Sequence, residues 1–122
     1  MVNPHDVPSA QQLVEAVREW LERDVMPGTS GRMQFNARVA ANVLAMVERE
    51  LEVGPQQSAA HAARLAEFDC ADDAELARRI REGELDHRLS EVRAAVYASV
   101  LDKLRVANPK YLAEQNNERG QR

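Results

Sequence analysis

The chain has 122 residues, 44% hydrophobic and 30% charged, with a formal net charge of −4 at pH 7. This length fits one ordinary domain, the composition excludes disordered and fibrous classes, and the acidic balance argues against nucleic-acid binding over the whole surface. No apolar run approaches the roughly 18 residues that cross a bilayer and the N-terminal MVNPHDVPSAQQ lacks an export signal, so we expect a cytoplasmic protein with no membrane segment.

The N-terminal part of the chain predicts a lead-in followed by a helix. Residues 1–8 contain two prolines and are expected to be extended. A helix is predicted over residues 9–26, because Ser9 and Gln12 form a capping-box pattern and apolar residues recur behind them at three- and four-residue spacing. Pro27-Gly28 ends this helix.

A second helix is predicted over residues 31–52, ending before Gly54-Pro55. It carries one apolar stripe of large side chains and a second stripe of alanines. The two stripes consist of Phe35, Val39, Val43, Met46 and Val47, and of Ala37, Ala41 and Ala45. Because such a helix can be contacted from both sides, we place it at the centre of a bundle.

Three further helices are predicted at 56–69, at 72–82 and at 89–107, the first two being the weaker members. The 72–82 helix has an Asp-x-x-Glu capping pattern at its start, and Gly83 after it is a left-handed terminator. Asn108-Pro109 ends the last of the three helices.

The predicted fold class is therefore all-α, an up-and-down helical bundle of four to five helices in a single domain. We expect the bundle to cover residues 9–112. Residues 113–122 are polar and are expected to form a frayed C-terminal tail.

Polar side chains interrupt the apolar sides of the first two helices and form a candidate polar cluster at their seam. Arg38, Asn42 and Arg49 follow one edge of the apolar arc of the second helix at i, i+4 and i+11, and Asn36 lies within that arc. In the first helix, Asp24 falls within the apolar arc. A polar group buried at a helix seam is costly unless it is paired, so these residues point to a specified contact.

Three interpretations of this cluster remain open, one of them being that its side chains are simply exposed to solvent. In the structural one, which we favour, Asp24 and Arg38 form a partly buried ion pair, Asn42 satisfies the remaining lone pairs, and the register of the two helices is fixed. In the functional one, the cluster is a small pocket for an anion or an amide, because arginine forks suit carboxylate and phosphate groups.

The sequence carries no constellation typical of a metal, cofactor or catalytic site. His5, His61 and His87 have no ligand-type spacing to one another or to Cys70, which we interpret as a small buried hydrophobe. The serines lack a strand–turn–helix elbow, and the glycines form no phosphate loop. We therefore expect no enzyme activity, no cofactor and no metal.

Five arginines lie in and after the 72–82 segment, interleaved with glutamates: Arg78, Arg79, Arg81, Arg88 and Arg93. We interpret them as a solvated face of ion pairs, because interleaved opposite charges rarely make a nucleic-acid surface.

Four segments in this order resemble a family of small bacterial helical domains of unknown function: HDVPSAQQLVEAVREWLERDVMP, FNARVAANVLAMVEREL, ELARRIREGELD and VLDKLRVANPKYL. The resemblance covers about residues 5–112. It emphasises His5, Asp6, Pro8, Arg38, Asn42, Glu48, Arg49, Glu50, Gly83, Asn108 and Pro109, without giving any of them a chemical role. Such proteins are often encoded beside aminoglycoside-phosphotransferase-like kinases and acyl-CoA dehydrogenases, so the resemblance implies an accessory role.

Two functional hypotheses follow. The first is a non-catalytic interaction protein that binds a phosphotransferase-like kinase, an acyl-CoA dehydrogenase or a second copy of itself. The second is a bundle that binds a small acyl or phosphorylated metabolite, with Asp24, Asn36, Arg38 and Asn42 around an apolar slot.

Overall fold

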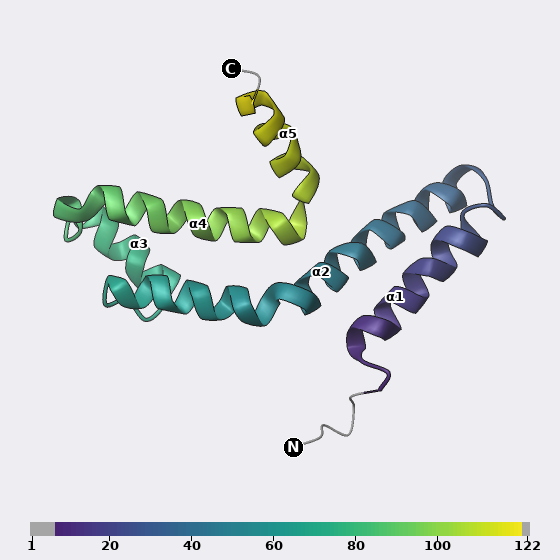
Figure 1. Cartoon of the computed structure of the whole chain (residues 1–122), viewed down its shortest axis with the longest axis horizontal. Helices are drawn as coiled ribbons and strands as arrows, with labels where there is room; N and C mark the ends of the chain where they lie inside the picture. The colour runs from purple at the N-terminus through teal and green to yellow at the C-terminus, as the bar shows by residue number, and fades with distance from the viewer. Residues whose placement is uncertain (1–6, 121–122) are drawn as a thin grey trace. The chain divides into compact units, whose positions relative to one another are not determined.

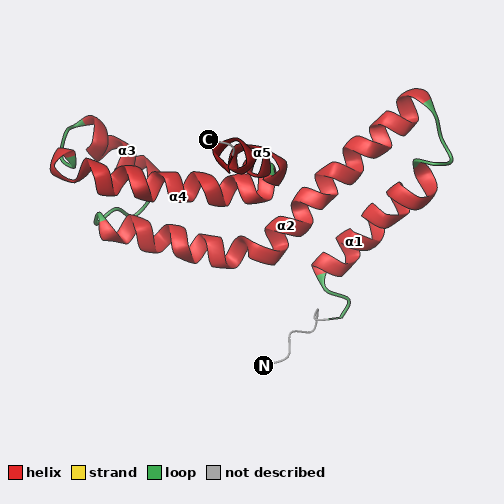
Figure 2. Cartoon of the chain, turned by 45° about the horizontal axis from the view of Figure 1, so that its top comes forward, coloured by secondary structure: helices red, strands yellow, loops and turns green. Residues whose placement is uncertain are grey.

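The computed structural model describes residues 7–120, which form five α-helices and no strand (Figures 1 and 2). The α-helices are α1 (Ala10–Trp20), α2 (Gly31–Glu67), α3 (Asp73–Arg81), α4 (Leu89–Ala107) and α5 (Pro109–Gly120). A π-helical turn, η1 (Leu21–Val25), follows α1, and a 3-10 turn, η2 (Asp86–Arg88), precedes α4. The predicted all-α helical-bundle fold class is confirmed.

Internal contacts divide the chain into two compact units, Met1–Gly54 and Pro55–Arg122. Within the first unit, α1 and the N-terminal half of α2 lie side by side as a helical hairpin. The second unit contains the rest of α2 together with α3, α4 and α5. Most of the expected lead-in, residues 1–6, lies outside the described residues.

The first helix begins as its capping pattern predicts. The Ser9 hydroxyl oxygen accepts a hydrogen bond from the Gln12 backbone N–H at 3.1 Å, and the Gln12 side chain accepts one from the Ser9 N–H at 2.8 Å. After the π-helical turn η1, which continues this helix, the Thr29 hydroxyl donates a hydrogen bond to the Val25 carbonyl at 2.6 Å. These bonds satisfy terminal backbone groups that have no partner within the helix.

Helix α2 corrects the prediction of separate helices at 31–52 and 56–69, because it runs without interruption through Pro55. Proline removes one backbone donor and crowds the preceding turn, which costs about 3 kcal/mol in a helix interior. The residues beyond it each add a helical hydrogen bond, and Gln57 also donates to the Asp102 carbonyl of α4 at 2.9 Å. Packing therefore overrides the local signal to break the helix.

Both predicted signals around α3 are confirmed. The Asp72 carboxylate accepts a hydrogen bond from the Glu75 N–H at 2.8 Å, and Gly83 has a φ of +77° in the turn that ends the helix. A side chain at that left-handed position would be strained, which is why glycine terminates the helix there.

Residues 113–120, expected to form part of a frayed tail, belong to helix α5. Asn108-Pro109 does end α4, but it also starts the next helix. The Asn108 side-chain oxygen accepts a hydrogen bond from the Tyr111 N–H at 3.2 Å, as an N-terminal cap does. Pro109 occupies the first helical position, where its missing N–H carries no cost.

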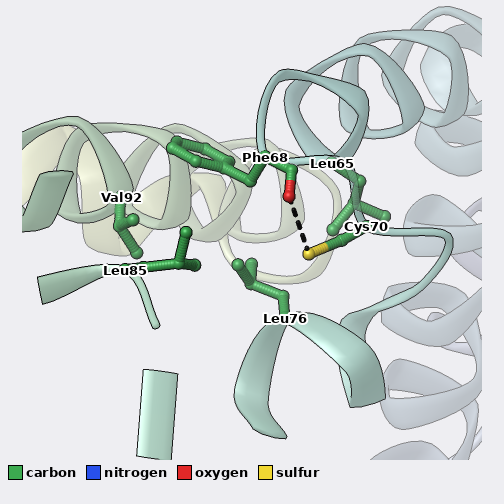
Figure 3. Packing of buried hydrophobic residues seen from close by; sticks show 6 residues of the cluster. All are labelled: Leu65, Phe68, Cys70, Leu76, Leu85 and Val92. Atoms are coloured by element: carbon green, nitrogen blue, oxygen red, sulfur yellow. Dashed lines mark hydrogen bonds between the residues drawn. The ribbon is translucent and has the colours of Figure 1, made fainter. Parts of the chain in front are cut away.

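The second unit has a hydrophobic core where the end of α2, helix α3 and the start of α4 meet (Figure 3). Its members are Leu65, Phe68, Cys70, Leu76, Leu85 and Val92. Phe68 and Leu85 are the largest fully buried side chains among the described residues. The Arg88 guanidinium lies 4.7 Å from the centre of the Phe68 ring, so a cation–π contact covers the outer side of this core.

We expect Leu85→Ala to lower the free energy of unfolding by about 2–5 kcal/mol, because it leaves a cavity in this core. The matched control is Leu89→Ala, since Leu89 is 47% exposed and Leu85 only 2%. Urea unfolding followed by far-UV circular dichroism measures both changes. Equal losses of stability in the two variants would show that Leu85 is not a core residue.

Candidate functional site

The polar contact between α1 and α2 is made by Arg18 and Glu48. The Arg18 guanidinium donates through Nε and Nη2 to the two Glu48 carboxylate oxygens, and through Nη1 to Glu22 at 3.0 Å. The Arg18 and Glu48 side chains are only 22% and 15% exposed. The hydrogen bond to Glu48 raises the pKa of Arg18 above its usual value. A paired contact at the seam is therefore present, between residues other than the predicted ones.

The candidate cluster of Asp24, Asn36, Arg38, Asn42 and Arg49 does not assemble as predicted. Asp24, Asn36, Arg38 and Asn42 are exposed, and Arg49 is half-buried. Asp24 and Arg38 form no ion pair with each other. The reason is that the apolar arc of the first helix is divided: Val14, Leu21 and Val25 are half-buried, whereas Asp24 lies on the side of Val17 and Trp20, which is exposed.

Alanines explain which side of α2 faces α1. Ala37 and Ala41 are the buried residues of the described part of the first unit, with 6% and 3% of their surface exposed. Glu48, which binds Arg18 of α1, follows them at helical spacing on the same side of α2. Helix α1 therefore packs against the small-residue stripe predicted from the sequence.

Two stripes of large apolar side chains on the hairpin remain exposed. The α1 stripe consists of Leu13, Val17 and Trp20, and the α2 stripe consists of Phe35, Val39, Val43 and Met46. These side chains expose between 37% and 61% of their surface. Residues two positions apart on a helix point about 200° apart, so Phe35 and Val39 lie opposite Ala37 and Ala41. Helix α1 therefore cannot cover the α2 stripe.

A polar network connects three helices of the second unit. The His61 ring of α2 lies between the Ser99 hydroxyl of α4, at 2.9 Å from Nδ1, and the Asp73 carboxylate of α3, at 2.8 Å from Nε2. Arg64 donates to the same Ser99 oxygen at 3.1 Å and to Asp102 at 3.1 Å. The network joins α2 to both α3 and α4.

Serine, histidine and aspartate here stand in the chemical order of a nucleophile, its base and an orienting carboxylate. The surroundings are nevertheless unlike a hydrolase site. Ser99 lies in the middle of α4, where backbone N–H groups are engaged in the helix and do not form an oxyanion hole. Its oxygen already accepts a hydrogen bond from Arg64, and Asp73 is 77% exposed. These contacts suit a structural clamp better than acyl transfer.

Sequence reasoning missed this network, although one signal for it was present. His61 stands four and seven residues before Leu65 and Phe68, on the side of the helix that forms the core. That spacing indicates a half-buried histidine in need of partners. The partners themselves, on α3 and α4, are set by tertiary packing.

The predicted pairing of the arginines with nearby glutamates is confirmed for three of them. Arg78 pairs with Glu82, Arg79 with Glu84, and Arg88 with Glu91, at 2.6, 3.1 and 2.6 Å. The interpretation of Cys70 as a small buried hydrophobe is also confirmed, and its thiol donates to the Phe68 carbonyl at 3.4 Å (Figure 3).

Within residues 7–120, no three His, Cys, Asp or Glu side chains come close enough together to hold a metal ion. None of the helices formed by these residues combines the length and the apolarity needed to cross a bilayer.

The geometry defines an all-α protein whose helices are joined by ion pairs and whose hairpin leaves apolar stripes exposed. The family described as Domain of unknown function (DUF6285) matches residues 27–111, and the chain belongs to this family. The match begins after α1 and η1, so it is shorter at the N-terminal side than the resemblance over residues 5–112. No curated protein and no solved structure matches the chain.

We expect the Arg18–Glu48 contact to show strong coupling in a double-mutant cycle. Arg18→Met and Glu48→Gln should each lower the free energy of unfolding by about 1–3 kcal/mol, because each leaves a half-buried charge without its partner. The double variant should lose less than the sum by about 1 kcal/mol or more.

The control cycle uses the exposed pair of Glu19 and Arg23, whose side chains are 38% and 75% exposed. Its coupling should not exceed about 0.5 kcal/mol. Thermal or urea unfolding measures both cycles, and additive effects at Arg18 and Glu48 would show that the contact does not form in solution.

Proposed function

We propose that this chain is a non-catalytic accessory protein that works by binding other proteins through exposed apolar helix surfaces. The observation that carries the proposal is the amount of large apolar side chain left in water. The hairpin exposes the α1 and α2 stripes, and α4 exposes Leu89, Val96, Tyr97 and Val100 by 41% to 49%. Contiguous exposed apolar surface of this kind is typical of protein interaction sites.

The resemblance noted from the sequence supports a choice of partner. We propose a phosphotransferase-like kinase or an acyl-CoA dehydrogenase of the bacterial cytoplasm, encoded beside the gene for this chain. The α4 surface, defined as Leu89, Val96, Tyr97 and Val100, suits such a partner. This surface consists of four side chains and is therefore small. Small interfaces are typical of transient complexes. Tyr97 offers an aromatic anchor of the type that dominates binding energy.

The small-ligand hypothesis receives no comparable support. Its residues Asp24, Asn36, Arg38 and Asn42 are exposed and line no apolar slot between α1 and α2. The fully buried residues of the described part of the first unit are Ala37 and Ala41, which carry no polar side chain that could bind such a ligand.

The binding proposal predicts that Tyr97→Glu weakens binding to the purified partner at least about tenfold, because it places a charge in the apolar contact. The measurement is biolayer interferometry of the immobilised chain against the purified kinase and the purified dehydrogenase. Ser90→Glu is the matched control, since it adds the same charge at an exposed polar position of α4. Equal affinities of the two variants, or no binding by the unmodified chain, would contradict the proposal.

The non-catalytic part of the proposal has its own test at Ser99. We expect the chain and its Ser99→Ala variant to hydrolyse p-nitrophenyl acetate at the same rate, because the helix around Ser99 supplies no backbone oxyanion donors. Circular dichroism checks that the variant is folded. A clear loss of hydrolysis in Ser99→Ala would assign a nucleophilic role to this serine.

A further inference from the structure

We propose that the α4 surface binds an acidic amphipathic helix of a partner protein, and that Arg93 and Lys103 each pair with a carboxylate at one end of the apolar contact. This inference rests on the proposed function, because it names the chemistry of the partner segment that the α4 surface takes. It follows from the charges on α4 and from their spacing.

Two cationic side chains lie in line with the exposed apolar side chains of α4. Arg93, Val96, Val100 and Lys103 follow one another at three-, four- and three-residue spacing, and both cations are exposed. Residues at this spacing share one side of a helix, so one cation lies at each end of the apolar pair. The Val92 side of α4, by contrast, packs in the core of the second unit.

Both cations are available to a partner. Within residues 7–120, neither Arg93 nor Lys103 forms an ion pair, although Arg93 is one of the five arginines expected to pair with a nearby glutamate. The acidic residues of α4, Glu91 and Asp102, pair with other arginines at 2.6 and 3.0 Å. They stand nine and two residues from Val100, which is about 180–200° around the helix. The exposed apolar side of α4 is therefore flanked by positive charge alone.

The spacing of the two cations defines the occupant. Arg93 and Lys103 are ten residues apart, which is a rise of about 15 Å along the helix. A helix that packs along α4 places its apolar side chains between those of α4. Such a helix pairs with both cations if it carries a carboxylate at each end of a similar apolar stripe. The expected segment therefore has two Asp or Glu residues ten positions apart, with apolar residues between them at three- and four-residue spacing.

An acidic helix fits this surface better than an anionic membrane does. Basic segments that bind membranes carry clusters of about four to eight Lys or Arg residues. The α4 surface is flanked by Arg93 and Lys103 only, and the net charge of −4 on the chain opposes its approach to an anionic bilayer. Two separate positive charges instead suit complementary charges at two points of one partner, which fix the register of the contact.

The first test uses a synthetic helical peptide as the probe. It carries two glutamates ten residues apart, with leucines three, four and seven residues after the first of them. A second peptide has lysines in place of the two glutamates and is otherwise identical. We expect the full chain to bind the acidic peptide, and to bind the lysine peptide at least about tenfold more weakly, because like charges then face each other. Isothermal titration calorimetry at low ionic strength measures both affinities.

The second test removes the two cations. The double variant Arg93→Gln, Lys103→Gln should bind the acidic peptide about fivefold or more weakly at low salt, because two exposed ion pairs are lost. The difference should shrink as salt is added, because salt screens exposed charges. The matched control is the double variant Arg81→Gln, Arg105→Gln, which removes two charges from exposed positions outside the α4 surface. It should bind the peptide as the unmodified chain does, and circular dichroism checks that both variants are folded.

Three results would overturn the inference. They are equal binding of the acidic and the lysine peptide, binding of the acidic peptide that Arg93→Gln, Lys103→Gln leaves unchanged at low salt, and use of the two cations in a different contact. The last is recognised when the same double variant abolishes binding to phosphatidylserine vesicles, or abolishes self-association of the chain in sedimentation equilibrium.

The inference and the proposed function fail in different ways. A kinase or dehydrogenase that binds the Arg93→Gln, Lys103→Gln variant as tightly as the unmodified chain at low salt would refute the acidic helix and leave the proposed function standing. A chain that binds the acidic peptide through the two cations but binds neither enzyme would do the reverse for those partners.

Discussion

The arrangement of the first unit depends on one steric constraint, which is that α1 packs against the side of α2 where the side chains are smallest. Ala37 and Ala41 are the fully buried residues of the described part of the first unit, and Glu48, which binds Arg18 of α1, lies on the same side of α2. A hairpin of two helices covers one side of each helix. Because the alanines occupy the covered side of α2, the larger side chains, such as Phe35 and Val43, are left to the solvent.

Features that depend on spacing within one helix were predictable from the sequence. The Ser9 cap, the Asp72 cap and the Gly83 terminator are where their patterns placed them, because each involves residues three or four positions apart. The two stripes of α2 were predictable for the same reason. The break expected at Pro55 was wrong, because α2 continues through it in spite of a local penalty of about 3 kcal/mol.

The contacts between helices were not predictable, because the angular position of a residue on its own helix does not specify which part of that helix meets a neighbour. Asp24 was placed in the apolar arc of the first helix by its spacing, but it lies on the exposed part of that arc, with Val17 and Trp20. Arg18, which was not among the predicted members of the polar cluster, binds Glu48 of α2. The sequence thus indicated a polar contact at this seam without identifying its members.

The Arg18–Glu48 contact has a role that the alanines of the seam cannot perform. The apolar contacts of the seam involve Ala37, Ala41 and half-buried side chains such as Val14 and Leu21. Such contacts are non-directional, and a slide of one helix along the other by one turn moves them by about 5.4 Å. A bidentate contact between a guanidinium and a carboxylate is broken by a slide of that size. The ion pair therefore specifies the register of the hairpin, while Ala37 and Ala41 are buried on the side of α2 that carries Glu48.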